Sequence, residues 1–339
     1  MTEAPIGITM GCPAGVGPEI IIKALAGNEA SDATPYVVIG DMSILKRACE
    51  ATGLSHMIPR LREWRPGSAT QPGMVNVMPV TTLSDSDVPF GTVSETTGRA
   101  SYSYITEAIR LCMDHELSAM VTAPINKEGL KLAGIDLPGH TEILARQTGT
   151  RNYAMMLAGP RLRVTLVTIH CALKDVAPAL SAEKVLRLIK ITHQALTDLF
   201  RIKDPAIGVA ALNPHAGESG MFGDEEERII IPAVNQARQA GISASGPWPP
   251  DTIFHAAWNN AYDAVVCMYH DQGLIPFKLV HFDNGVNITL GLPIIRTSVD
   301  HGTAYDIAGT GKASEESMVA AMDMAAMFAL NRTKKPCST

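Results

Sequence analysis

Three histidines are the residues whose placement most clearly suggests chemistry: His170, His215 and His270. Each follows a short apolar run rich in β-branched residues, and ligands of open α/β sheets collect beyond the carboxyl ends of the strands. Three neutral imidazoles that meet there would form an open site for a divalent cation and leave positions for substrate oxygens. Their separations match no local zinc signature, and any one of them alone is more often a hydrogen-bonded histidine of the core or a loop.

Carboxylates accompany two of these rings. Asp271 directly follows His270, and Glu218 lies in the turn-forming segment that starts at Asn213 and contains His215. A carboxylate beside an imidazole can orient the ring or exchange a proton with it. The same acids could instead cap neighbouring helices, and both interpretations can hold at once.

A second group of polar residues could bind an anion. His140 and Thr141 open a helical run over 142–147. Thr141 could be an ordinary N-cap, or the hydroxyl, the imidazole and the helix N-terminus could together face an anionic substrate.

Two cations and an amide lie further along in otherwise apolar sequence: Lys278, Asn287 and Arg296. A cation in apolar surroundings needs an anionic partner, because burying an unpaired charge is unfavourable. The partner could be a substrate, or simply Asp283 or Asp300, and the residues alone favour neither.

The glycine-rich segments argue against two familiar nucleotide motifs. Residues 11–19 read Gly-Cys-Pro-Ala-Gly-Val-Gly-Pro-Glu, which departs from the Gly-x-Gly-x-x-Gly fingerprint after Gly17. A tight strand-to-helix connection is therefore a better interpretation than a dinucleotide site. Residues 309–313 match only the end of a P-loop, since the first glycine and a Ser or Thr after Lys312 are missing.

Positioning these residues requires strands that alternate with longer helical patterns. Strands are predicted at 6–10, 36–40, 75–80, 120–123, 163–169, 206–211 and 264–269. Helices are predicted at 18–26, 98–115, 182–200, 224–240 and 314–331, with Ser181 at the entry of the third. The alternation predicts an α/β fold of mostly parallel sheets flanked by helices.

The chain is expected to form two domains that interrupt one another, because no linker, repeat or low-complexity tract separates them. The first domain is predicted to comprise residues 1–125 with 280–339, and the second to comprise residues 126–279. Within 276–297 the apolar pieces are broken by Asp283-Asn284-Gly285 and Gly291-Leu292-Pro293. These turn signals predict an antiparallel excursion or a long functional loop.

Composition and charge exclude some classes of protein. Of the 339 residues, 46% are hydrophobic, which is enough for a sizeable core. The 34 acidic residues exceed the 28 Lys and Arg residues, so the formal net charge is −6. Binding to nucleic acid is disfavoured, because it needs a field of cations.

The same sequence predicts a cytoplasmic protein without membrane association. The first residues lack the positive charge and apolar core of a secretory signal, and the apolar stretch 318–330 is too short to span a bilayer. The cysteines have no Cys-x-x-Cys spacing, which fits reduced thiols. They are Cys12, Cys49, Cys112, Cys171, Cys267 and Cys337.

Several segments resemble, in order and spacing, the 4-hydroxythreonine-4-phosphate dehydrogenase family. They include Thr-Ala-Pro-Ile-Asn-Lys, Gly-His-Thr-Glu, Asn-Pro-His-Ala-Gly-Glu and Tyr-His-Asp-Gln-Gly, at 122–127, 139–142, 213–218 and 269–273, together with 8–19 and 285–304. The match covers nearly the whole chain. Residues 275–282, Ile-Pro-Phe-Lys-Leu-Val-His-Phe, are most similar to the family's 4-phospho-D-threonate 3-dehydrogenase branch.

The resemblance implies a metal site and a substrate site. The metal ligands would be His170, His215 and His270, the last of which would reach the site from the other subunit of a homodimer formed through the second domain. The active site would therefore lie at the subunit interface. The substrate contacts would be His140, Thr141, Lys278, Asn287 and Arg296.

Residues 301–309 are also similar to the adenine-binding loop of isocitrate and isopropylmalate dehydrogenases. This similarity implies a fold like that of those enzymes and an NAD site at His301, Gly302, Thr303, Ala304 and Asp306. Cys12 departs from the family pattern, because relatives usually carry an acid at this position. The departure leaves the role of that turn residue open.

The implied reaction is oxidation of 4-phospho-D-threonate at C3 by NAD, followed by decarboxylation to dihydroxyacetone phosphate and carbon dioxide. A divalent zinc, cobalt, magnesium or manganese ion would act on the C3 oxygen as a Lewis acid. Lys278 and Arg296 would neutralise substrate charge. Asp251, Asp271 and Lys278 are the candidate catalytic residues, the two acids for proton transfer.

Two other functions remain open. The first is the 4-hydroxy-L-threonine 4-phosphate dehydrogenase of pyridoxal phosphate biosynthesis, whose substrate has an amine at C2. The second, from a different class, is a metal-dependent aldolase or hydrolase that uses the same histidines without a nicotinamide.

Overall fold

The computed structural model describes residues 4–27 and 34–333 of the chain. Cys337 and the first three residues, which entered the expectations above, lie outside the described residues. The chain divides into two compact units: Met1–Arg151 with Leu292–Ala329, and Asn152–Gly291 with Leu330–Thr339. The domain limits predicted from the sequence stay a prediction.

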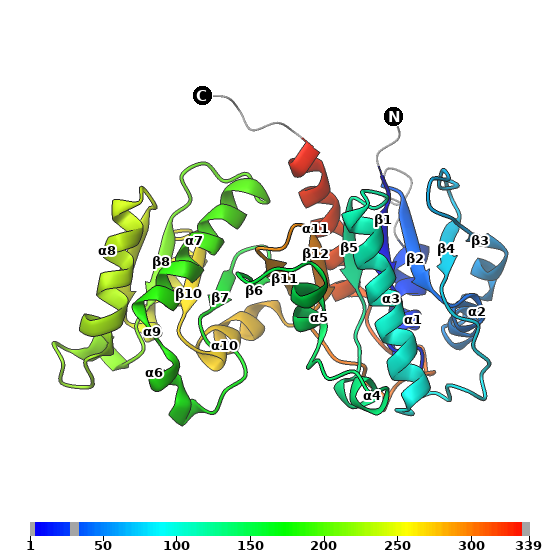
Figure 1. Cartoon of the computed structure of the whole chain (residues 1–339), viewed down its shortest axis with the longest axis horizontal. Helices are drawn as coiled ribbons and strands as arrows, with labels where there is room; N and C mark the ends of the chain where they lie inside the picture. The colour runs from blue at the N-terminus through cyan, green and yellow to red at the C-terminus, as the bar shows by residue number, and fades with distance from the viewer. Residues whose placement is uncertain (1–3, 28–33, 334–339) are drawn as a thin grey trace. The chain divides into compact units, whose positions relative to one another are not determined.

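The first unit is built on a sheet in which every neighbouring pair of strands is parallel. Across the sheet the strands are β3 (Leu61–Glu63), β4 (Val75–Pro79), β2 (Tyr36–Gly40), β1 (Ile6–Thr9), β5 (Ala119–Thr122) and β12 (Arg296–Val299). Figure 1 shows that β12, far along the chain, lies beside β5.

Helices of the first unit connect and cover these strands. They are α1 (Gly17–Gly27), α2 (Met42–Ala51), the 3₁₀ turn Ser55–Arg60, α3 (Glu95–Met113), α4 (Lys127–Leu132), α5 (His140–Gln147) and the greater part of α11 (Glu316–Thr333). The long helix α3 packs on β1, β2 and β5 (Figure 1).

The second unit has a mixed sheet. Its strands are, in order, β11 (Val286–Leu290), β6 (Ala154–Ala158), β7 (Arg163–Leu166), β10 (Ala264–Cys267), β8 (Ile207–Ala210) and β9 (Ala244–Trp248). The pairs that involve β6 are antiparallel, and the pairs from β7 to β9 are parallel.

The helical elements of the second unit join these strands. They are the 3₁₀ turns Leu173–Asp175 and Pro214–Gly217, the π-helical turn Glu226–Ile230, α6 (Val176–Ala179), α7 (Ala182–Asp198), α8 (Ile231–Gln239), α9 (Pro250–Trp258) and α10 (His270–His281). Figure 1 shows α7, α8, α9 and α10 gathered around this sheet.

The core of the second unit fixes helix α10. Leu274 and Phe277 point from α10 into a cluster of buried strand residues that includes Val164 and Val265. Burying a side chain of this size stabilises a fold by about 1.5–3 kcal/mol. The packing therefore holds the helix that carries His270 and Lys278.

The predicted fold class is confirmed: parallel and mixed sheets are flanked by helices in both units. All of the predicted strands and helices occur, with ends shifted by a few residues, and Ser181 caps α7 by accepting a hydrogen bond from the Lys184 N–H. The expectation for 276–297 is right for β11, which runs antiparallel to β6, but wrong at its start. Residues 276–281 continue α10, because its packing overrides the helix-breaking tendency of Pro276.

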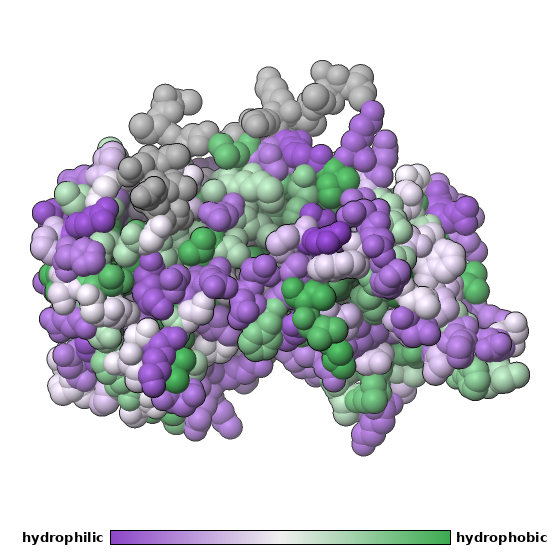
Figure 2. Space-filling model, turned by 180° about the vertical axis from the view of Figure 1, so that it is seen from behind, coloured by the Kyte–Doolittle hydropathy of each residue, from purple (hydrophilic) through white to green (hydrophobic). Residues whose placement is uncertain are grey.

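Among the described residues, no helix has both the length and the apolar character needed to cross a membrane. Figure 2 shows one face of the surface, where hydrophobic side chains appear between hydrophilic ones.

Candidate active site

The three candidate histidines follow three neighbouring parallel strands of the second unit. Strands β7, β10 and β8 lie side by side, and His170, His270 and His215 come after their respective carboxyl ends. The structure thus places the histidines at one edge of the sheet, as the strand pattern predicts. Their role as metal ligands stays a prediction.

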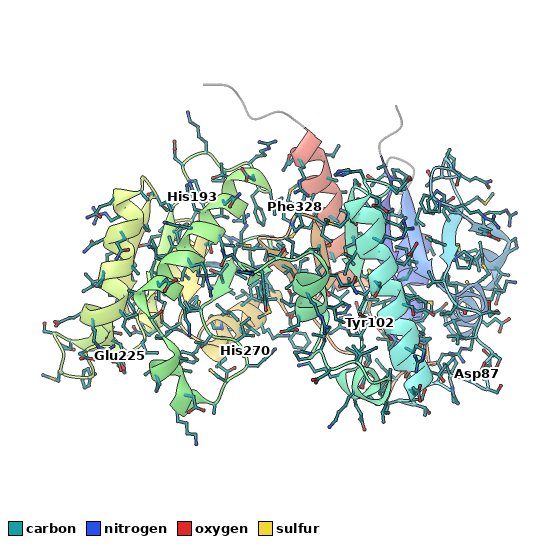
Figure 3. All side chains as sticks on the ribbon, in the orientation of Figure 1. Asp87, Tyr102, His193, Glu225, His270 and Phe328 are labelled. Carbon is teal, nitrogen blue, oxygen red and sulfur yellow. The ribbon has the colours of Figure 1, made fainter. Side chains whose placement is uncertain are left out.

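His170 and His270 are close neighbours. Their ring centroids are 5.7 Å apart, and the ring planes are inclined by 40°. His270 is the first residue of α10 (Figure 3), and its Nδ1 lies 2.7 Å from Oδ1 of Asp271. Because Asp271 engages Nδ1, Nε2 is the nitrogen that this ring can offer to a cation.

His215 lies in a strained turn. Its φ is 51°, and Ala216, Glu218 and Ser219 also have positive φ values, of 56°, 45° and 56°. Residues with a Cβ adopt this conformation only where the surrounding structure imposes it, and such strain is concentrated at functional sites. The His215 ring is exposed, and its centroid is 6.4 Å from that of Phe222.

A buried carboxylate fixes the start of this turn. Glu226 is 2% exposed, and its Oε1 accepts hydrogen bonds from the N–H groups of Leu212 and Asn213 at 2.8 Å each. Its Oε2 accepts a third from Nδ2 of Asn213 at 2.9 Å. Glu226 begins the π-helical turn, a feature frequent at functional sites. Glu226 therefore positions the segment that carries His215.

Across residues 4–27 and 34–333, no three His, Cys, Asp or Glu side chains of one chain are grouped so as to hold a metal ion. The adjacent rings of His170 and His270 are nevertheless a donor pair suited to a divalent cation. In the described part of the chain His215 is therefore not grouped with these two rings.

Arg296 is a buried cation in the first unit. It opens β12 and is only 3% exposed, and its Nε and Nη2 donate to Oγ1 of Thr122 at 3.1 and 2.7 Å. Burial lowers the pKa of Arg296 to about 9, a shift that the carboxylate of Glu142 opposes. An anion against this guanidinium would offset the loss of hydration.

His140 adds an imidazole to the same place. It is the first residue of α5, whose N-cap is Gly139, so the interpretation of Thr141 as the N-cap is wrong. Nε2 of His140 is buried and has no hydrogen-bond partner within the described part of the chain. Burial, and then the charge of Arg296, hold the pKa of His140 well below its usual value. The ring is therefore neutral near pH 7 and can make one further hydrogen bond.

The remaining predicted substrate and catalytic residues belong to the second unit. Lys278 lies on α10 with its Nζ 5.7 Å from the ring centroid of Phe282. Nδ2 of Asn287, on β11, donates to Sδ of Met155 at 3.4 Å. Asp251 is exposed in the first turn of α9. That these side chains and Arg296 meet at one substrate stays a prediction.

The predicted cofactor loop follows β12 in the first unit. His301, Gly302 and Asp306 are exposed, whereas Thr303 is buried. A Cβ built on Gly302 would meet no atom within 4 Å, so space adjoins the backbone here. Open space beside this partly exposed loop leaves room for a ligand.

Sequence reasoning missed Thr122, Glu226 and the buried acid Glu19. Thr122 ends an apolar strand, and its contact with Arg296 joins residues far apart in the chain. Glu19 directly precedes the apolar run 20–22, which is a weak signal of burial, whereas Glu226 lies in the acidic run 224–227 and nothing in the sequence distinguishes it.

A cavity of about 600 Å³ lies elsewhere in the first unit. It is lined by residues that precede β1, β2 and β4, among them Pro5, Pro35 and Met74, and by Trp64. None of the predicted site residues lines it. The cavity is therefore separate from the predicted site.

Comparison with known proteins identifies the family. The family model described as pyridoxal phosphate biosynthetic protein PdxA matches residues 31–325. A 4-hydroxythreonine-4-phosphate dehydrogenase of Geobacter metallireducens is 54% identical over 97% of this chain and 96% of its own length. A D-threonate 4-phosphate dehydrogenase of Salmonella typhimurium is 45% identical over 97% of this chain and 100% of its own length.

A solved structure agrees with these relatives. The crystal structure of a 4-hydroxythreonine-4-phosphate dehydrogenase from Klebsiella pneumoniae is 44% identical, with a TM-score of 0.86 over 96% of this chain and 100% of that one. The chain therefore belongs to the PdxA family of dehydrogenases.

Proposed function

We propose that the protein oxidises a four-carbon 4-phosphorylated 3-hydroxy acid at C3 with NAD and then releases the C1 carboxylate as carbon dioxide. The observation that carries this proposal is the buried cation Arg296 beside the unsatisfied Nε2 of His140. Together they offer an anionic substrate two kinds of hydrogen-bond donor in a place shielded from water. With 4-phospho-D-threonate the product is dihydroxyacetone phosphate.

The roles of the anion-binding residues follow from their chemistry. Arg296, held by Thr122, can make a two-pronged contact with a phosphate or a carboxylate. His140 is neutral, so it orients the anion through a hydrogen bond without adding charge. Thr141 and Lys278 complete the proposed set, with Asn287 bonding a substrate hydroxyl.

A divalent ion is the second proposed requirement. His170, His270 and His215 would hold it, and their common position after three neighbouring parallel strands supports this assignment. When bound, the ion supplies Lewis-acid polarisation of the C3 oxygen. Asp271 would keep the His270 ring in the tautomer that presents Nε2, and Asp251 is the candidate for moving the C3 proton.

NAD is proposed to bind at residues 301–306. The exposure of His301, Gly302 and Asp306 and the open space at Gly302 support the assignment. Membership in a family of dehydrogenases also favours hydride transfer over the aldolase or hydrolase alternative.

The protein is further proposed to act as a cytoplasmic homodimer. Ile275, Leu279 and Phe282 are 67%, 83% and 71% exposed, and their spacing places them on one face of α10 and its C-cap. Exposed apolar side chains gathered in this way mark an interaction surface. A second copy is the proposed occupant, because the same helix begins with His270, the ligand expected from a partner subunit.

Sedimentation tests the dimer. Leu279→Glu should convert a dimer into monomers, because a charge in an apolar interface is unfavourable. Leu132→Glu is the matched control, since Leu132 is also exposed, at 51%, but lies on α4 of the first unit. A monomeric wild-type protein would exclude the dimer.

Two substrates fit the proposal. 4-Phospho-D-threonate is the first candidate, on the resemblance of residues 275–282. 4-Hydroxy-L-threonine 4-phosphate is the second, and the name of the relative with 54% identity favours it. The two acids differ only at C2, which carries a hydroxyl in the first candidate and an amine in the second.

Absorbance of the reduced nicotinamide decides between them. Purified protein is mixed with NAD, a divalent salt and either acid. A faster rate with the D-threonate phosphate supports the first candidate, and a faster rate with the aminated acid supports the second. No absorbance change with either acid would exclude the dehydrogenase activity.

A further inference from the structure

The proposed NAD loop is seated on the turn between β1 and α1. The N–H of Val16 donates to the carbonyl of Thr303 at 3.1 Å, and Sγ of Cys12 lies 3.1 Å from the hydroxyl of Tyr305. Gly15 is so close that a Cβ on it would stand 2.9 Å from the Thr303 carbonyl oxygen. The glycine-rich turn is therefore occupied by another loop of the chain and is not open to an anion.

Glu19 makes the most polar of these contacts. Its side chain is 0% exposed, in the first turn of α1. Oε1 accepts a hydrogen bond from the N–H of Gly309 at 2.5 Å, and Oε2 accepts one from the N–H of Gly311 at 2.8 Å. One carboxylate thus binds both ends of the tight segment that closes the loop.

The chemistry of this contact requires a carboxylate. Gly309 and Gly311 have φ values of 82° and 69°, a left-handed conformation that only glycine adopts readily. Their N–H groups converge on two acceptor oxygens, and hydrogen bonds to a charged acceptor are stronger than neutral ones. An amide in place of Glu19 would present one acceptor and one donor, so one N–H would lose its partner.

We infer that Glu19 is a positioning residue for NAD: it holds the 303–311 loop in its binding shape without touching the cofactor. The inference rests on the proposed function, since it takes residues 301–306 as the NAD site. Cys12 also holds this loop in place, more weakly, through the contact of its Sγ with the Tyr305 hydroxyl. This assigns a role to the position at which the sequence departs from the family pattern.

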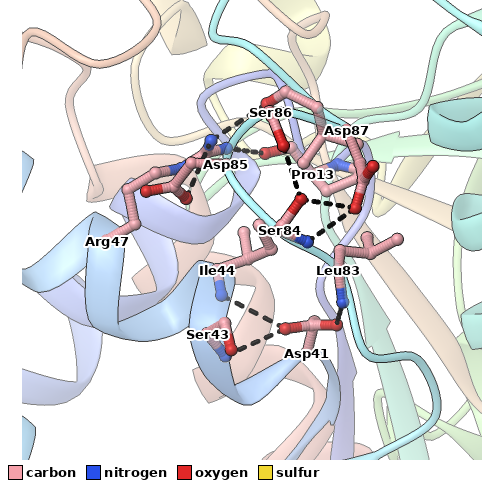
Figure 4. A network of polar contacts seen from close by, with 11 residues as sticks. Pro13, Asp41, Ser43, Ile44, Arg47, Leu83, Ser84, Asp85, Ser86 and Asp87 are labelled. Carbon is pink, nitrogen blue, oxygen red and sulfur yellow. Dashed lines mark hydrogen bonds and ion pairs between the residues drawn. The ribbon is translucent and has the colours of Figure 1, made fainter.

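Another buried carboxylate in the same unit provides a matched control. Asp41 is 1% exposed and accepts hydrogen bonds from the N–H groups of Ser43, Ile44 and Leu83 (Figure 4). It caps α2 and holds a different loop. Asp41→Asn therefore removes a comparable buried charge away from the 303–311 loop.

The experiment compares Glu19→Gln with Asp41→Asn in the full-length protein. Equilibrium binding of NAD is measured by fluorescence in metal-free buffer, and amide hydrogen exchange is followed in peptides that cover 303–311. Glu19→Gln should raise the Kd for NAD at least tenfold and speed exchange of these peptides, while the KM for the phosphorylated acid and kcat at saturating NAD change less than threefold. Asp41→Asn should lower the melting temperature but leave the Kd for NAD within twofold.

The outcomes separate this inference from the proposed function. Wild-type protein that binds no NAD defeats both. Faster exchange in Glu19→Gln with an unchanged Kd for NAD overturns the inference alone, as does an equal loss of NAD affinity in Asp41→Asn. Should Glu19→Gln fail to fold, Cys12→Ala replaces it, with an expected two- to threefold rise in the Kd for NAD. An unchanged Kd in that variant also overturns the inference.

Discussion

The two units differ in the burial of their candidate site residues. In the first unit Arg296 and His140 carry buried polar atoms, and Thr122 fixes the guanidinium. In the second unit the rings of His170 and His215 are exposed, and the turn that carries His215 is strained. Buried side chains that are fixed by packing and hydrogen bonds keep their geometry without a ligand, whereas exposed imidazoles need a bound ion or a neighbouring chain to fix them. We therefore expect anion binding to be preorganised and metal binding to be coupled to assembly.

Removing the buried cation should have the largest effect. Arg296→Met is expected to lower kcat/KM for the phosphorylated acid by at least ~30-fold, because loss of one partner of a buried charge pair costs about 2–5 kcal/mol. Arg296→Lys, which keeps the charge but not the two-pronged contact, should fall between this variant and the wild type. Steady-state kinetics with phosphorylated and unphosphorylated acids provide the measurement. Equal losses for the two acids would show that Arg296 does not bind the phosphate.

Removing an exposed ring should abolish metal-dependent turnover without harming the fold. His215→Ala is expected to lose more than ~100-fold in activity, beyond the 10–100-fold typical of groups that only support a ligand. Its melting temperature should equal that of the wild type, because His215 packs little. Bound metal is counted by elemental analysis, with His56→Ala, another exposed histidine, as the control. Full activity of His215→Ala after chelation would remove the metal hypothesis.

The turn that carries His215 offers a sharper test of the second unit. Glu226→Gln should lower the free energy of unfolding by about 1–3 kcal/mol, because a buried N–H of Leu212 or Asn213 loses its charged acceptor. It should also weaken metal binding, which calorimetric titration with Zn²⁺ measures. Glu227→Gln, an exposed neighbour, is the control. Unchanged metal affinity in a destabilised Glu226→Gln protein would limit this residue to a structural role.

Each unit also contains a histidine that makes stability depend on pH. Burial lowers the pKa of His140 in the first unit and of His281 in the second below the usual 6.5. The unfolded chain therefore binds protons at these rings that the folded chain does not bind. The free energy of unfolding should consequently fall as the pH drops through 6.5 towards 5. Each ring contributes at most ~1.4 kcal/mol per pH unit. Denaturant titrations from pH 8 to 5 should show this fall, and His281→Asn should reduce it; an unchanged slope would contradict the assignment.

The sequence predicted the strands and helices that are determined by their own residues rather than by contacts with distant parts of the chain. β-Branched runs identify β1, β2 and β10, which are fully buried. By contrast, β6 reads Ala-Met-Met-Leu-Ala and β9 contains Gly and Pro, so neither carries a strand signal. α10 was missed because Pro276 argues against a helix that only its packing reveals.

For the site, residue types could be predicted but contacts could not. The placement of three histidines after strands follows from the strand pattern, and it is observed. The contacts of Arg296 with Thr122 and of Glu19 with Gly309 join residues that are 174 and 290 positions apart. No local pattern encodes such pairs, because the order of strands in the sheet brings them together.

A crystal structure with the phosphorylated acid bound is the most direct measurement of the central claim, which is that Arg296 and His140 of the first unit bind a substrate anion. We predict anionic oxygens at hydrogen-bond distance, ~2.7–3.0 Å, from the Arg296 guanidinium and from Nε2 of His140. An acid bound elsewhere, with these two side chains contacting only protein, would contradict it.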